Sequence, residues 1–107
     1  MKYLCLAYAD QKKWDSLPKS SQDALLAQDA ILRGQGHLVA AVAEATTVRF
    51  VNGTATTSAG PLARSREQLA GFYLIEASNL EEVSRLIVGT PCAEVGAFEV
   101  WQVQVAL

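Results

Sequence analysis

Three runs of apolar residues predict the strands of a sheet. Residues 3–9 are apolar and aromatic and end at the polar segment 10–13, which is typical of a strand buried on both faces. Residues 71–77 are also apolar, and strand geometry directs their odd- and even-numbered side chains to opposite faces. Residues 98–105 alternate in the same manner and place Trp101 on one face with the valines that follow it.

Residues 16–33 predict the first helix. Serines near its start are candidate N-cap residues, and Pro18 suits a first turn. Gly34 or Gly36 would end the helix. Its apolar residues do not form one clean stripe, so the pattern indicates a helix without defining the buried face. We expect the preceding segment, which contains Trp14, to be a loop.

The segment that follows the second apolar run predicts another helix. Ser78 with Glu81, or Asn79 with Glu82, forms a capping box at its start. Gly89 and the proline after it end the helix. The apolar positions recur at the spacing of one helical face: Leu80, Val83, Leu86 and Ile87.

A β-hairpin is predicted in the middle of the chain. Residues 46–51 are β-branched and aromatic, residues 54–57 favour a strand, and Asn52-Gly53 separates the two runs. Asn-Gly at this place is the strongest short hairpin signal, because both turn residues must tolerate positive φ. Residues 37–43 predict one further strand before the hairpin.

The predicted order is strand, helix, strand, hairpin, strand, helix, strand. This order favours an α+β fold, ferredoxin-like (split βαβ), with an antiparallel sheet and an added β-hairpin. Two helices cover one face of such a sheet and leave the other face, which is also apolar, open. A second copy of the chain is the simplest cover, so we expect a homodimer through the open sheet face.

Composition fits one ordinary globular domain over residues 1–107. Half of the 107 residues are hydrophobic and 19% are charged. The net charge is −2 and no run of Lys or Arg is present, so nucleic acid is not an expected partner. The sequence contains no phosphate-binding loop, dinucleotide motif or cluster of metal ligands, so we expect no cofactor and no metal.

The cysteines and the first residues favour a cytoplasmic location. Cys5 lies in an apolar run and is expected to be buried, and Cys92 follows Pro91 in an expected loop. Two such cysteines do not form a disulfide framework, which fits a reducing compartment. The apolar run at residues 3–9 is too short for a signal peptide or a membrane span.

Several segments of the chain match the pattern of a known family. They are GPLA at residues 60–63, EQLAGFYLIEA at 67–77, MKYL at 1–4, GHL at 36–38, ATTVR at 45–49 and VGAFEV at 95–100. Together they resemble the YCII-related family, in its "DGPF" subgroup, whose pattern reads Asp-Gly-Pro-Phe-Ala-Glu and, a few residues later, Leu-Gly-Gly-Phe-Tyr-Leu-Ile-Glu-Ala. The resemblance implies a dimeric α+β barrel with ferredoxin-like subunits.

The resemblance also implies what family members do, and this chain departs from the pattern. The family includes proteins proposed to be small enzymes, with a His and the motif Asp facing a cleft, and some members are associated with extracytoplasmic-function sigma factors. Here the motif Asp is Ala59, the Phe is Leu62 and the Glu is Arg64. An alanine can neither accept a proton nor orient a histidine, so chemistry that depends on this Asp should be impaired or altered.

His37, the only histidine, is the candidate catalytic residue. It could act as a general acid or base, since its reference pKa of about 6.5 suits that work. The family's arrangement needs a carboxylate beside it, which Asp10 or Glu76 could supply in place of Ala59. The alternative is a plain polar residue at a helix-to-strand turn, and Glu76 has the alternative of a structural contact with a loop or a partner.

A ligand site is expected near the hairpin and the turn after it. Arg49 could hold an anionic ligand, because a guanidinium pairs bidentately with carboxylates. Ser58 and the Gly60-Pro61 turn could shape a pocket wall, and Asp10 and the Tyr73 hydroxyl could add polar groups. The alternatives are an ordinary loop for Ser58 to Pro61, without a nucleophile elbow, and a core position for Tyr73.

Three functions remain open from the sequence. The first is a small-molecule-binding domain for a small anionic or cyclic ligand, non-catalytic or altered because of Ala59. The second is a small enzyme that uses His37 on a small cyclic or carboxylated substrate. The third is a regulatory partner in sigma-factor signalling.

Overall fold

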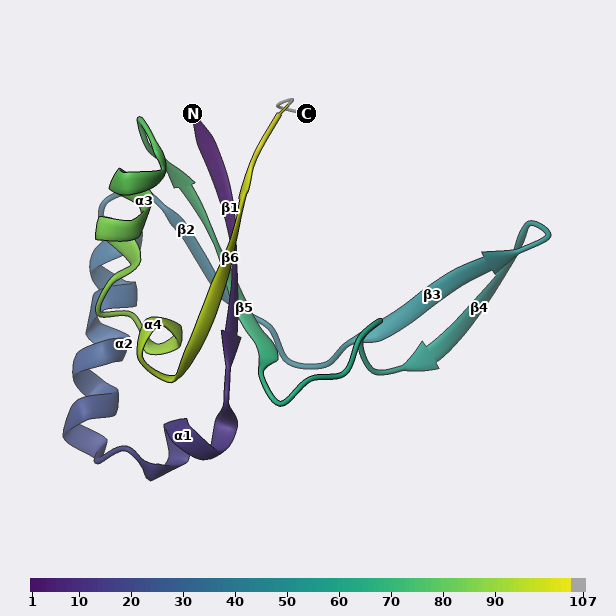
Figure 1. Ribbon diagram of the computed structural model, residues 1–107, viewed down its shortest axis with the longest axis horizontal. Helices are drawn as coiled ribbons and strands as arrows, with labels where there is room; N and C mark the ends of the chain where they lie inside the picture. The colour runs from purple at the N-terminus through teal and green to yellow at the C-terminus, as the bar shows by residue number, and fades with distance from the viewer. Residues whose placement is uncertain (105–107) are drawn as a thin grey trace.

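A computed structural model describes residues 1–104 and shows an α+β fold around a four-stranded antiparallel sheet (Figure 1). The strands of this sheet are β1 (Lys2–Ala9), β2 (Leu38–Ala41), β5 (Gln68–Glu76) and β6 (Gly96–Gln102). Their order across the sheet is β2-β5-β1-β6. This is the order that a split βαβ connectivity requires, so the predicted ferredoxin-like fold is confirmed.

Two longer helices connect the strands. Helix α2 (Lys19–Gly34) follows β1, and α3 (Leu80–Ile87) follows β5. Both lie on the same side of the sheet (Figure 1). The buried core forms between them and this face of the sheet, and it contains Tyr3, Cys5, Ala7, Leu32, Tyr73, Ile75, Ala77, Val83, Ile87 and Cys92.

Two short helices were not predicted. Trp14, expected in a loop, lies in α1 (Gln11–Ser16), which begins because the Asp10 carboxylate accepts the backbone N–H of Lys12 at 3.0 Å. Cys92, also expected in a loop, is buried in α4 (Pro91–Val95), whose proline occupies the first turn. Helices of one to two turns are too short to show an apolar period, which is why the pattern missed them.

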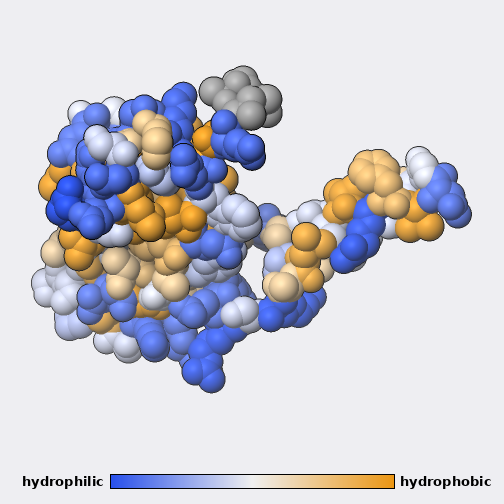
Figure 2. Space-filling view, turned by 45° about the horizontal axis from the view of Figure 1, so that its top comes forward, coloured by the Kyte–Doolittle hydropathy of each residue, from blue (hydrophilic) through white to orange (hydrophobic). Residues whose placement is uncertain are grey.

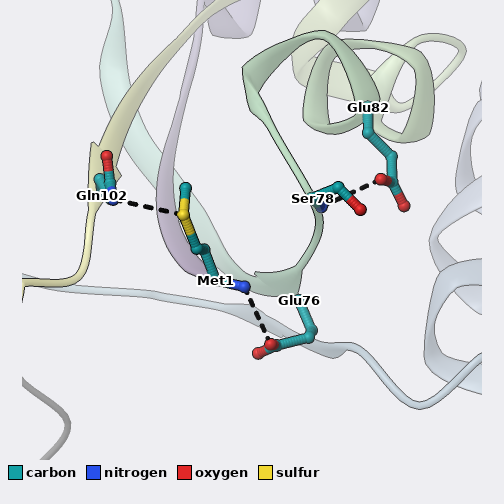
Figure 3. Close-up of polar contacts among 5 residues, drawn as sticks. All are labelled: Met1, Glu76, Ser78, Glu82 and Gln102. Atoms are coloured by element: carbon teal, nitrogen blue, oxygen red, sulfur yellow. Dashed lines mark hydrogen bonds and ion pairs between the residues drawn. The ribbon is translucent and has the colours of Figure 1, made fainter.

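The start of α3 follows the second of the two predicted capping boxes. The Asn79 side chain accepts the backbone N–H of Glu82 at 2.9 Å. The Glu82 carboxylate in turn accepts the backbone N–H of Ser78 at 3.0 Å (Figure 3). The bond from Ser78 lowers the pKa of Glu82. The predicted apolar stripe is correct only in part, because Val83 and Ile87 are buried whereas Leu80 is 56% exposed.

The outer side of the sheet, which we call the open face, carries no helix among residues 1–104 (Figure 1). Two rows of side chains cross the open face, and each row consists of residues that lie opposite one another on the four neighbouring strands. The first row is Leu38, Leu74, Leu4 and Trp101, and the second is Ala40, Phe72, Leu6 and Glu99. Leu38 is 54% exposed and Trp101 is 57% exposed, so a wide apolar surface faces solvent in the single chain.

The predicted hairpin is confirmed and stands apart from the four-stranded sheet. Strands β3 (Thr46–Val51) and β4 (Thr54–Ala59) pair only with each other in the described part of the chain. Asn52 and Gly53 have φ of 51° and 80°, which are the positive values that the tight turn requires. The hairpin projects from the sheet on the side opposite to the helices (Figure 1).

Element boundaries differ from the expectations by a few residues. Strand β4 extends to Ala59, β5 begins at Gln68, and β6 begins at Gly96. The predicted last strand included Val105, which lies outside the described residues.

Candidate functional site

A cavity of about 370 Å³ lies between the sheet and the helices α1, α2 and α4. We call it the sheet–helix cavity. Its floor is formed by small residues at one end of the sheet, where Ala7 of β1 pairs with Gly71 of β5, and Gly71 pairs with Ala41 of β2. At the other end of the same face, large side chains such as Tyr3 and Ile75 fill the space. The cavity therefore exists because small side chains coincide in register across three strands.

Helices and the remaining strand residues form the walls of this cavity. Trp14 contributes from α1, and Pro91, Cys92 and Val95 contribute from α4. The other lining residues are Ala9, Gln11, Leu26, Asp29, Arg33, Val39, Ala40, Ala70 and Tyr73. The lining is mainly apolar, with its charged groups confined to α2.

One polar cluster faces the sheet–helix cavity. The Tyr73 hydroxyl donates a hydrogen bond to the Asp29 carboxylate, and Arg33 follows Asp29 by one turn of α2. Burial raises the pKa of Asp29, and the Tyr73 hydrogen bond and the Arg33 charge oppose that shift. Burial also raises the pKa of Tyr73, and its hydrogen bond to Asp29 adds to the effect. The hydroxyl is therefore a hydrogen-bond donor rather than a phenolate at neutral pH.

The Tyr73 ring is held by its neighbours. It contacts Phe98 edge to face, with ring centroids 5.3 Å apart and planes at 71°. This contact and the hydrogen bond to Asp29 fix both ends of the side chain. The position of the hydroxyl in the cavity is thus determined before any ligand enters.

Cys92 lines the same cavity but does not provide a nucleophile. Burial, with a smaller contribution from the Asp29 charge, raises the pKa of its thiol to about 11. The thiolate is the reactive form of cysteine, and at neutral pH it is scarcely populated here. Cys5, on β1, has its pKa raised to about 11 by burial as well, and we regard both cysteines as core residues.

The predicted site residues outside the hairpin region, in the four-stranded sheet and its helices, lie partly in this cavity and partly elsewhere. Tyr73 lines the cavity. Asp10 lies between the lining residues Ala9 and Gln11, but its carboxylate caps α1. His37 is half-buried at the start of β2, where its backbone N–H donates to the carbonyl of Leu32 at 3.1 Å, and it does not line the cavity.

The predicted residues of the hairpin region lie away from the sheet–helix cavity. Arg49 and Ser58 are exposed on β3 and β4. Gly60 follows β4 with φ of 100°, and Pro61 is exposed beside it. The Gly60 carbonyl accepts the Thr47 hydroxyl at 2.8 Å, which closes the base of the hairpin. None of these residues lines the cavity.

Glu76 makes a structural contact at the end of β5. Its carboxylate lies 3.1 Å from the N-terminal ammonium of Met1 (Figure 3). Its side chain is 64% exposed, so this ion pair contributes little to stability. The side-chain amide of Gln102 donates to the Met1 sulfur on the other side.

Sequence reasoning missed Asp29, Arg33 and Trp14 as lining residues. The inward side of α2 carries Gln22 and Asp29 alternating with Leu25 and Leu32, so polar residues interrupt the stripe by which a buried face is recognised. The spacing of Asp29 and Arg33, four residues apart on a helix, was an available signal. This spacing alone, however, does not show whether the two residues form an ion pair on the surface or line a cavity.

A family model described as the YCII-related domain matches residues 1–105, which is nearly the whole chain. No curated protein matches the sequence significantly. Among residues 1–104, no three His, Cys, Asp or Glu residues are grouped as a metal site would need. Within the same residues, no helix has the length and apolar character that crossing a membrane requires.

Proposed function

Because this chain belongs to the YCII-related domain family, we propose that it is a small-molecule-binding protein whose ligand occupies the sheet–helix cavity. The observation that carries the proposal is a mainly apolar cavity of about 370 Å³ with one fixed polar cluster. Ligand pockets typically have volumes of roughly 300 to 1,000 Å³ and a few convergent polar groups. This cavity lies at the lower end of that range, which favours a ligand of about one ring.

The polar cluster suggests the chemistry of the ligand. Arg33 is exposed on the cavity wall, so its guanidinium is free to pair with a carboxylate. The Tyr73 hydroxyl and Asp29 add a hydrogen-bonding pair at the same wall. We therefore propose a small ring that carries one carboxylate or phenolic group, with the ring against the alanines and Trp14.

Binding is better supported than covalent or acid–base catalysis. The Cys92 thiol is protonated at neutral pH, and the family's motif Asp is Ala59 in this chain. An enzyme using His37 would need a carboxylate beside the imidazole. The side-chain hydrogen bonds among residues 1–104 include none to His37.

The same proposal includes a homodimer formed by the open faces of two copies. The chain exposes 7555 Å². A compact monomer of this mass exposes about 5,800 Å². The radius of gyration is 15.6 Å, against about 13 Å for a compact chain of this length. This extra surface and the apolar rows of the open face support a second copy as the cover.

Ligand binding is tested by NMR titration of the isotope-labelled protein with benzoate, phenol and cyclohexanol as separate probes. We expect benzoate to shift the Trp14 indole and the methyl groups of Ala7 and Ala41 together, and to bind more tightly than the uncharged probes. The Arg33→Gln variant should lose the preference for benzoate. Lys19→Gln is the control, since Lys19 belongs to the same helix and lies outside the cavity.

Two results would oppose the proposal. Shifts confined to residues around His37 or Arg49 would move the site to another part of the molecule. The second result is saturable binding of benzoate in the sheet–helix cavity with an affinity that neither Arg33→Gln nor Lys19→Gln changes. The cavity would then remain the binding site, but Arg33 would not bind the carboxylate of the ligand.

A further inference from the structure

The hairpin β3–β4 receives no visible support from its own chain. In the part of the chain that the structure describes, the hydrogen bonds of residues 45–60 join residues of that segment to each other. The Gly60 backbone N–H donates to the Ala45 carbonyl at 2.9 Å, so the two ends of the segment meet. A two-stranded hairpin alone is at best marginally stable in water. Some other surface must therefore stabilise it.

One face of the hairpin is apolar. The pairing places Phe50 opposite Ala55 and Val48 opposite Thr57, so Val48 and Phe50 lie on the same face. Phe50 is 73% exposed and Val48 is 50% exposed. The apolar residues are visible along the projecting hairpin in Figure 2. The opposite face carries Arg49, Val51 and threonine and serine side chains, so it is the more polar of the two.

The composition of the hairpin also favours burial against protein. Residues 46–59 contain one charged residue, Arg49. Exposed edge strands usually carry lysines, prolines or other charges that prevent association. Arg49 is the one residue of this kind within residues 46–59, so we expect both edges of the hairpin to be covered by protein.

The direction of the hairpin identifies what covers it. It projects on the side of the open face, where the second copy would lie (Figure 1). Strands of this length span about 20 Å, whereas two sheets packed face to face are about 10 Å apart. A hairpin that projects on this side therefore extends past the plane of the facing sheet. It reaches the body of the second copy.

We propose that the hairpin is an arm exchanged between the two copies of a dimer, with its Val48–Phe50 face packed on the body of the partner. The inference rests on the homodimer proposed above and adds a second contact between the copies, made by the hairpin. By symmetry, each copy supplies an arm and receives one. The surface in excess of a compact monomer, about 1,750 Å², is roughly twice the 800 Å² that one partner contributes to a standard interface. It is sufficient for both the open face and the arm.

The first test compares dimer dissociation constants by sedimentation velocity. The double variant Val48→Thr/Phe50→Thr places β-branched threonines, which favour strands, at both positions and removes the apolar surface of the arm. We expect the dissociation constant to rise by about tenfold or more, since large apolar anchors dominate interfaces. Val51→Thr is the matched control, because Val51 is 57% exposed and lies on the other face of the arm. Its constant should stay within about threefold of the wild type.

A second test locates the arm directly and does not depend on the variants folding alike. Phe50 is replaced by the photo-crosslinking residue p-benzoylphenylalanine, and light and heavy isotope-labelled chains are mixed before irradiation. Crosslinks between light and heavy chains are expected. Crosslinks confined to single chains would show that the arm packs on its own body and would overturn the exchange.

The outcomes separate this inference from the dimer itself. If the double variant dimerises like the wild type while Leu38→Lys on the open face weakens the dimer, the exchanged arm is wrong and the face-to-face dimer stands. If the wild type is monomeric at all concentrations tested, the dimer is wrong and the exchanged arm with it.

Discussion

Asp29 is a carboxylate on the side of α2 that faces the sheet. It shares this side with Leu25 and Leu32, and Leu32 is fully buried. An unpaired polar group at such a place is destabilising, and the hydrogen bond from Tyr73 offsets part of that cost. Burial therefore disfavours the charged form of Asp29, and this supports the ligand contact proposed above for the cavity.

The ionisation of Asp29 should make the free energy of unfolding depend on pH. Burial raises the pKa of Asp29 above its ordinary value of 3.8, despite the opposing influence of Arg33 and Tyr73. Between the unfolded and folded pKa values the folded state binds more protons, so this residue makes the free energy of unfolding fall as pH rises. Asp29→Asn removes the titration and keeps an acceptor for Tyr73. Its free energy of unfolding, relative to the wild type, should increase from about pH 4 to pH 7.

Urea unfolding at a series of pH values measures this difference. Asp23→Asn, on the exposed side of the same helix, controls for the loss of a negative charge. A difference between Asp29→Asn and the wild type that stays flat or falls with pH would mean that the interactions of the carboxylate outweigh its burial.

At the scale of the elements, the local sequence pattern predicted the strands and the hairpin, but it did not predict the sheet–helix cavity. Alternation and the Asn52-Gly53 turn are encoded within a few neighbouring residues. The cavity is different, because it depends on Ala7, Gly71 and Ala41 meeting in register across strands that are distant in sequence. The ligand site predicted near His37 and Arg49 came from the chemistry of these side chains together with a family resemblance, and neither residue lines the sheet–helix cavity.

The close approach of β1 and β6 at Gly96 predicts that a larger residue there lowers the stability of the protein. A Cβ at Gly96 would lie 1.8 Å from the backbone oxygen of Tyr8, where β6 meets β1. Backbone cannot move aside cheaply, so Gly96→Ala should lower the free energy of unfolding by about 2 to 4 kcal/mol. Gly34→Ala is the control, because a Cβ there meets no atom within 4 Å. It should change stability by no more than about 0.5 to 1 kcal/mol.

Chemical denaturation of the two variants gives the comparison. Equal stability of Gly96→Ala and Gly34→Ala would show that the β1–β6 junction is looser than the structure indicates.

At the scale of the whole molecule, the shape is unusual for a chain of this length. The principal extents are 49 × 36 × 20 Å, and exposed large apolar residues lie both on the projecting hairpin and on the open face. Figure 2 shows the hairpin standing away from the rest of the chain. This shape supports the homodimer proposed above, in which a second copy covers the exposed apolar surfaces. Sequence patterning anticipated the uncovered face, because both faces of the predicted strands were apolar.

A charge placed on the open face should separate the copies. Leu38→Lys introduces an ammonium into the first row of the open face, where it would have to be desolvated in a face-to-face dimer. We expect the dimer dissociation constant to rise by about tenfold or more, measured by light scattering over a concentration series. Leu80→Lys on α3 is the control, since Leu80 is 56% exposed and Leu38 is 54% exposed. Equal constants for the two variants would argue against the open face as the interface.

The order of the strands also decides when the fold can form during synthesis. Strand β1 is central, and both of its partners, β5 and β6, lie in the C-terminal part of the chain. The ribosome therefore releases β1 well before anything can pair with it. At translation rates of roughly 5 to 20 residues per second, that interval lasts about 3 to 12 seconds. During this interval the apolar strand β1 is without its partners in the sheet, and an unpaired apolar strand of this kind is prone to aggregation.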